Sequence, residues 1–100
     1  MTTDEPGYDS FSGRVGMPFT VELDPDGAAT LTLTQCGPLL RAGGYSSYTL
    51  TFLGAAGQPL AQGTFVFSAD GIDSTPIFIV PIGATTDGIQ YEAVFNQRED

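Results

Sequence analysis

Histidine, lysine and tryptophan are absent from this chain of 100 residues, and cysteine occurs once. Without histidine there is no imidazole base, no serine–histidine or cysteine–histidine pair, and no histidine metal ligand. Without lysine there is no Schiff base and no ammonium group to hold a phosphate. We therefore expect a protein that is not an enzyme, with no catalytic, cofactor-binding or metal-binding residues and no cofactor.

Positive charge is also scarce. Three arginines (Arg14, Arg41 and Arg98) stand against twelve acidic residues, which gives a formal net charge of −9. Binding to nucleic acid or to an anionic membrane surface needs a basic face. We expect neither partner. The charge favours solubility, with recognition of a basic protein as the alternative.

Long apolar runs are missing too, so no membrane-spanning helix is expected. The first ten residues, MTTDEPGYDS, are acidic and lack the basic and apolar regions of a signal peptide. This predicts a cytoplasmic protein or a part of an assembled particle. We expect residues 1–10 to form a flexible acidic tail, residues 11–96 a single β domain, and residues 97–100 a flexible end.

The single cysteine, Cys36, cannot form an intramolecular disulfide or a multi-cysteine metal site. It ends the alternating run LTLTQC, which predicts a small buried hydrophobic side chain. A reactive thiol or an intermolecular bridge is the alternative interpretation.

The pattern of apolar residues is typical of strands. Ile77–Ile82 is apolar at every position, which predicts a strand covered on both faces. Residues 64–68 and 90–95 alternate, as half-buried strands do. The segment 47–53 alternates as well, with Tyr48, Leu50 and Phe52 inward. No helical stripe is present. We predict an all-β fold of about six strands in a mostly antiparallel meander, closed as a small barrel or packed as a sandwich.

One hairpin is predicted in detail. Pro25-Asp26-Gly27 favours a three-residue loop closed by Asp24 and Ala28, with Gly27 in the left-handed conformation. Phe19 would then lie opposite Leu33, Val21 opposite Leu31, and Thr20 opposite Thr32 on the outer face. The segment 37–44 is expected to be a loop from which Leu39 or Leu40 folds back onto the core.

Two acidic loops were considered as sites. Asp24 and Asp26 flank Pro25, and Asp70 and Asp73 flank Gly71. Neither has the spacing of an EF-hand, so both are interpreted as turns, with weak adventitious calcium binding as the alternative. An aromatic platform is not expected either, because parity places Tyr48 and Tyr91 in the core and leaves Tyr45 alone at the surface.

Three motifs resemble a small bacterial family of uncharacterised proteins. They are QGT-aromatic-x-aromatic at Gln62–Phe67, an apolar strand ending in PIG at Phe78–Gly83, and YEAVFN at Tyr91–Asn96. Relatives carry a histidine and proline in the loop that is Ala69–Asp73 here, so a role for that histidine does not transfer. The family is a domain of unknown function and implies no activity. The resemblance of this chain to the family implies a structural or assembly role, because genes of the family often lie near those of phage-tail-like fibre or collar proteins.

The sequence therefore predicts a non-catalytic structural or assembly module that acts through protein–protein contacts, with a protein partner or as a homo-oligomer. The alternative function is a β-module that binds a carbohydrate or a peptide. We expect assembly through a strand edge or through the apolar Ile77–Ile82 region.

Overall fold

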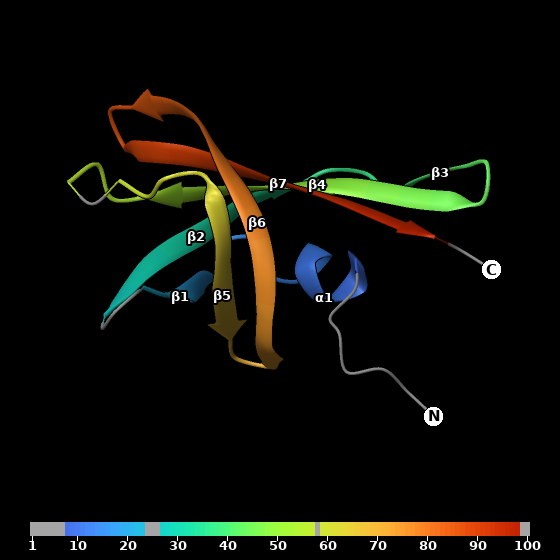
Figure 1. The fold of residues 1–100 in the computed structure, drawn as a ribbon, viewed down its shortest axis with the longest axis horizontal. Helices are drawn as coiled ribbons and strands as arrows, with labels where there is room; N and C mark the ends of the chain where they lie inside the picture. The colour runs from blue at the N-terminus through green and yellow to red at the C-terminus, as the bar shows by residue number, and fades with distance from the viewer. Residues whose placement is uncertain (1–7, 24–26, 58, 99–100) are drawn as a thin grey trace.

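The computed structural model describes residues 8–23, 27–57 and 59–98, which form one antiparallel sheet preceded by a short helix (Figure 1). In chain order the elements are α1 (Tyr8–Ser12), β1 (Pro18–Glu22), β2 (Ala28–Cys36), β3 (Leu40–Ala42), β4 (Tyr45–Gly54), β5 (Gly63–Ala69), β6 (Ile72–Thr85) and β7 (Gly88–Arg98). None of the described helical residues forms a segment long and apolar enough to cross a membrane.

Six of the strands close into a barrel. The neighbours run β2-β1-β5-β6-β7-β4, and β2 also pairs with β4, which completes the ring. The seventh strand, β3, lies outside the ring and pairs with β4. The all-β, mostly antiparallel fold is thus confirmed. Of the two predicted architectures, the barrel is the one that forms. The order departs from a simple meander at two pairings, because β4 pairs with β7 and β1 with β5, where a meander would pair β4 with β5.

The β1–β2 hairpin forms, but its predicted register is wrong by two residues. Phe19 lies opposite Leu31 and Thr20 opposite Thr30. The amide of Leu23 donates to the Gly27 carbonyl at 3.0 Å, so these two residues close the hairpin. A shift of two residues keeps every side chain on its predicted face, which is why the apolar pattern could not detect it. The loop residues 24–26 lie outside the described residues.

The segment expected to be a loop contains β3. Gly43 and Gly44 have φ values of 58° and 83°, and Ala42 pairs directly with Tyr45. Two successive left-handed residues in a two-residue connection are typical of a type I′ hairpin turn. The Gly-Gly pair was therefore a strand-turn signal that the sequence reasoning missed. Leu39 packs partly against the core, as predicted for one of the two leucines, while Leu40 stays 60% exposed.

Strand β6 divides its 14 residues between two partners. Its first part, from Ile72 to Ile79, pairs with β5, and its last part, from Val80 to Thr85, pairs with β7. The prediction that it is covered on both faces is wrong. Ile77 and Ile79 are buried, but Phe78 is 51% exposed and Ile82 50% exposed. An antiparallel barrel covers only the inner face of each strand, so alternate residues of β6 meet solvent.

The barrel interior holds the core, and each end is closed by a separate segment. At one end Phe11 of α1 is fully buried and packs against the rings of Phe19 and Phe95 at centroid distances of 6.2 and 5.6 Å. At the other end the amide of Leu60 donates to the Tyr91 hydroxyl at 2.8 Å. Both closures bring residues distant in sequence onto the barrel axis.

The predicted boundaries differ from the structure at both termini. Tyr8 and Ser10, which the sequence assigned to the tail, belong to α1, and residues 1–7 lie outside the described residues. A five-residue helix is too short to show the periodicity on which the sequence reasoning depended. At the other end β7 continues through Arg98, because it pairs with β4 as far as Tyr45.

Candidate functional site

The acidic residues singled out by the sequence form no cluster that could hold a metal ion in the part of the chain that the structure describes. No cluster of three or more histidine, cysteine, aspartate or glutamate side chains occurs among the described residues. Asp70 lies in the β5–β6 turn, where its backbone carbonyl accepts a hydrogen bond from Arg14 Nε at 3.1 Å. The guanidinium of Arg14 also lies against Gly71, so this turn serves to anchor the N-terminal segment. Asp24 and Asp26 lie outside the described residues.

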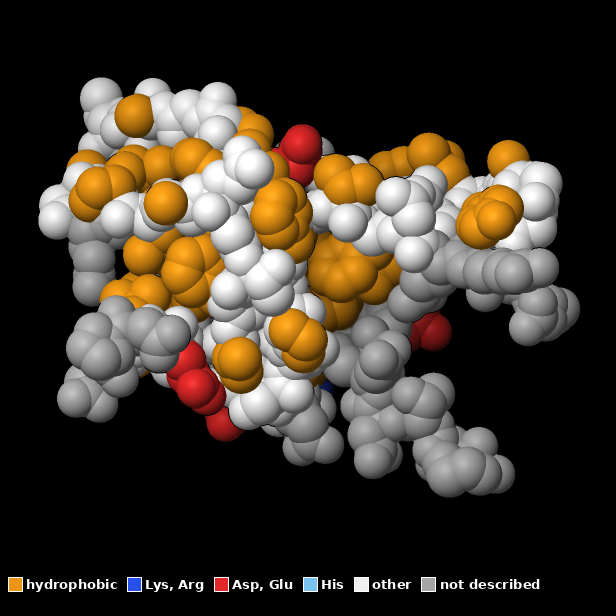
Figure 2. Space-filling model, in the orientation of Figure 1, with side chains coloured by type: hydrophobic (Ala, Val, Ile, Leu, Met, Phe, Trp, Pro, Cys, Tyr) orange, Lys and Arg blue, Asp and Glu red, His pale blue; other side chains and the backbone are white. Residues whose placement is uncertain are grey.

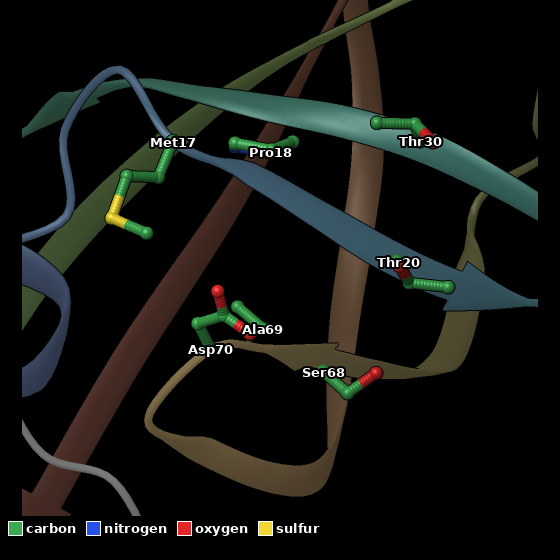
Figure 3. Close-up of a pocket in the computed structure, with 7 residues that line it drawn as sticks. All are labelled: Met17, Pro18, Thr20, Thr30, Ser68, Ala69 and Asp70. Atoms are coloured by element: carbon green, nitrogen blue, oxygen red, sulfur yellow. The ribbon is translucent and has the colours of Figure 1, made fainter.

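A surface groove opens between β1 and β5 (Figure 3). These strands pair only at Thr20–Ser68 and Val21–Phe67, among the described residues, and then diverge. The groove has a volume of about 580 Å³ and is lined by Met17, Pro18, Thr20, Thr30, Ser68, Ala69 and Asp70. In Figure 3 Asp70 reaches from the end of β5 toward β1.

Three hydroxyl-bearing residues cross this groove in one row. Thr30 of β2 lies opposite Thr20 of β1, which lies opposite Ser68 of β5. Neighbouring strands are about 4.8 Å apart, so the row offers hydroxyls at regular intervals. We call this row, Thr20, Thr30 and Ser68, the hydroxyl face. Hydroxyls beside one carboxylate can exchange hydrogen bonds with a polyhydroxylated ligand, although the lining has no aromatic ring on which a sugar could stack.

A second surface lies on the outside of β3, β4, β7 and β6. Leu40, Tyr45 and Val94 share the outer side of three paired strands and are 60, 54 and 58% exposed. Val80 and Phe78 continue this side on β6, since Val80 lies opposite Glu92 of β7. We call these five residues the apolar face. Figure 2 shows hydrophobic side chains spread over β6 and along the β3–β4–β7 sheet.

The apolar face carries little charge. Glu92 is the one carboxylate on it among the side chains that the structure describes, and it lies between Thr51 and Val80. The other described acidic side chains are on different parts of the molecule, at α1, at the end of β1 and in two turns: Asp9, Glu22, Asp70 and Asp87. A face whose described side chains include one charge, on a protein of net charge −9, is suited to contact with another uncharged surface.

Behind the apolar face lies an aromatic cluster that includes a cysteine. Cys36 at the end of β2 packs against the core but is only half-buried, so the prediction of a small buried hydrophobic side chain holds in part. Strand β2 ends at this residue. Burial raises the pKa of the Cys36 thiol, and a hydrogen bond with Tyr8 opposes this. A raised pKa leaves little thiolate at neutral pH, which disfavours reactivity.

Tyr48 completes this cluster. Its ring stacks on Phe95 at 4.8 Å and meets Tyr8 edge-on at 5.2 Å. Its hydroxyl is buried and has no hydrogen-bond partner among the described residues. Burial, and secondarily the nearby Cys36, raises the pKa of Tyr48 to about 12. The cluster therefore holds a buried hydroxyl that no described residue compensates.

The tyrosine predictions are confirmed, and the main surface feature was missed. Tyr48 and Tyr91 are in the core and Tyr45 is 54% exposed. The sequence reasoning did not find the apolar face, because it took an apolar β6 to mean a doubly covered one. The signal was available in Leu40 and Tyr45, because a hairpin turn at Gly43-Gly44 places both on the same side of the sheet.

Comparison with known proteins gives one match. A family model described as Domain of unknown function (DUF6916) matches residues 6–95. No curated protein and no solved structure matched. The matched segment spans nearly the whole barrel, from the residues before α1 to Phe95 of β7. The chain therefore belongs to the DUF6916 family, a domain of unknown function.

Proposed function

We propose that this protein is a non-catalytic structural or assembly module that acts through protein–protein contacts. The observation that supports this most directly is the apolar face, where Leu40, Tyr45, Phe78 and Val94 are each more than half exposed on the outer side of β3, β4, β6 and β7. Burying the exposed half of such a side chain is worth about 1 kcal/mol. Contacts with another protein would recover this free energy.

The setting we propose is a tail-like particle or a fibre. Support for the setting comes from the resemblance of the Gln62–Asn96 motifs, while the apolar face supports the protein contact itself. A closed barrel suits a structural role, because its strands leave few unpaired edges through which copies could associate without order.

Site-specific cross-linking tests the proposed contact. A photoreactive residue at position 94 should cross-link to a protein, whether a second copy or another chain, when the protein is expressed in its source. The same residue at position 20, on the hydroxyl face, is the matched control and should give little product. A chain that is monomeric in its source, with no protein product from position 94, would overturn the proposal.

The second candidate function is a module that binds a carbohydrate. The groove favours it, because Thr20, Thr30 and Ser68 align beside Asp70 around a volume of about 580 Å³. Amide NMR titration with a panel of oligosaccharides should then shift signals of these residues and not those of Val94. Thr20→Val keeps the side-chain shape and removes one hydroxyl, so it should weaken any specific binding. Unchanged spectra would exclude binding of the sugars tried and would favour the assembly function.

A further inference from the structure

The apolar face has the dimensions of a small protein interface. The β4–β7 ladder pairs Tyr45–Gly54 with residues 89–98 without interruption. Ten residues on each of β4 and β7, three on β3 and eight on β6 (78–85), at about 3.3 Å each on strands about 4.8 Å apart, give a face of roughly 500 Å². Two such faces in contact bury about 1,000 Å², which is below the range of stable specific interfaces and is the size of a weak, reversible one.

The charge distribution narrows the kind of partner. A basic protein would be attracted to carboxylates, and the described ones are mostly away from this face, at α1, at the end of β1 and in two turns. Among the side chains that the structure describes, contact at the apolar face buries Glu92 and otherwise only neutral ones. The surface that matches it is equally apolar and equally neutral. A second copy of this chain presents such a surface.

The arrangement of the apolar residues also permits two-fold symmetry. Val94 pairs with Thr49 near the middle of the ladder, Leu40 and Tyr45 lie toward β3, and Val80 and Phe78 lie on β6. A two-fold axis lying in the interface near Val94 places the β3 end of one copy over the β6 end of the other. Apolar side chains then meet apolar side chains at both ends, as an isologous interface requires.

We propose that the partner of the apolar face is a second copy of this chain, forming a two-fold dimer face to face. This inference rests on the proposed assembly function and names its partner. Each copy carries a formal charge of −9, so the two copies repel one another through solvent. Salt screens that repulsion, with a Debye length that falls from about 30 Å at 0.01 M to about 8 Å at 0.15 M. Dimerisation therefore strengthens as salt rises, whereas binding to a basic protein weakens.

Sedimentation velocity of the purified full-length chain tests the dimer. The wild-type protein should show a concentration-dependent monomer–dimer equilibrium whose Kd falls at least about threefold between 0.01 M and 0.15 M salt, as screening predicts. Val94→Glu places a like charge from each copy in the interface and should raise Kd at least about tenfold. Thr20→Glu adds the same charge on the hydroxyl face and should leave Kd within about twofold at 0.15 M salt.

Thermal unfolding of each variant shows whether it folds. Phe78→Ser is a second variant that removes an apolar side chain from the face without adding charge. A wild-type chain that is monomeric at every salt concentration overturns the dimer. A Kd that rises with salt also overturns the dimer. An equal loss of dimer affinity in Val94→Glu and Thr20→Glu overturns it as well. If the purified chain is monomeric but position 94 still cross-links to a different protein, the dimer is wrong and the assembly function stands.

Discussion

The two outer surfaces of the barrel differ although the same alternation builds both. On β1 and β2 the inward residues Val21 and Leu31 are buried, and the outward residues Thr20 and Thr30 present hydroxyls. On β4 and β7 inward side chains such as Leu50 and Tyr91 are buried too, but the outward ones include exposed large hydrophobics. Stability requires only the inward positions. The outward positions therefore show what the surface is used for, and the contrast lies between the hydroxyl face and the apolar face.

The largest effect should come from a substitution that removes the support of both faces. Phe11 is fully buried against rings from β1, β4 and β7. Phe11→Ala should lower the free energy of unfolding by about 3–5 kcal/mol. Val15→Ala, at a position that is 48% exposed, is the control and should cost less than about 0.5 kcal/mol. Urea unfolding measures both. A small loss for Phe11→Ala would show that α1 is not part of the core.

A substitution in the β3–β4 turn should disorder part of the apolar face and leave the hydroxyl face intact. Gly44 has a φ of 83°, where a β-branched residue is strained, so Gly44→Val should cost about 1–2 kcal/mol. NMR should show loss of the β3–β4 cross-strand contacts that hold Leu40 near Tyr45, while the β1–β2 contacts persist. Gly43→Asn is the matched control, because asparagine tolerates a φ of 58°. Equal loosening of both hairpins would contradict this division.

The hydroxyl of Tyr48 should make the wall behind the apolar face sensitive to alkali. Its pKa is about 12 in the folded protein and near 10 when exposed. The neutral form is therefore favoured by folding, and this stability is present below pH 10 and lost as pH rises toward 12. Tyr48→Phe should remove that loss. At neutral pH it should be neutral or stabilising by up to about 1 kcal/mol, because the buried hydroxyl lacks a partner among the described residues. Thermal unfolding between pH 7 and 11 is the measurement.

The smallest effect concerns Cys36, which lies where β2 ends between the two faces. Cys36→Ala should lower the free energy of unfolding by no more than about 1 kcal/mol, because a half-buried side chain leaves little cavity. A maleimide should react slowly with the wild-type thiol at neutral pH and faster as pH rises, since burial raises its pKa. Rapid labelling at pH 7 would instead favour the reactive-thiol interpretation.

Sequence reasoning found most of the strands and their inward faces, because period-2 alternation is a local property, but it missed the three-residue strand β3. It could not fix the register of the β1–β2 hairpin, since Phe19 opposite Leu31 and Phe19 opposite Leu33 bury the same face. It could not find the exposure of Phe78 either. Whether a second layer covers a strand depends on how the sheet closes, and closure is decided by β2–β4 pairing between distant segments.

The apolar face could be predicted in part from the sequence, and the groove could not. Tyr45 was expected at the surface, and Gly43-Gly44 indicates the turn that brings Leu40 to the same side, but Val94 comes from a strand that the sequence does not place beside them. The groove depends on the divergence of β1 from β5 after Thr20 and Ser68. Nothing in either segment alone indicates that divergence. Surfaces built from several strands are thus less predictable than the strands themselves.

The long ladder between β4 and β7 has a consequence for how the protein is made. Ribosomes deliver β4 well before β7, the last strand that the structure describes, and the two pair along ten residues. Hairpins such as β1–β2 and β3–β4 join neighbouring segments and can form during synthesis. The ring cannot close until β7 has emerged. Until then the apolar side of β4, with Leu50 and Phe52, stays uncovered, and this interval is when a nascent chain is most exposed to misfolding or to a chaperone.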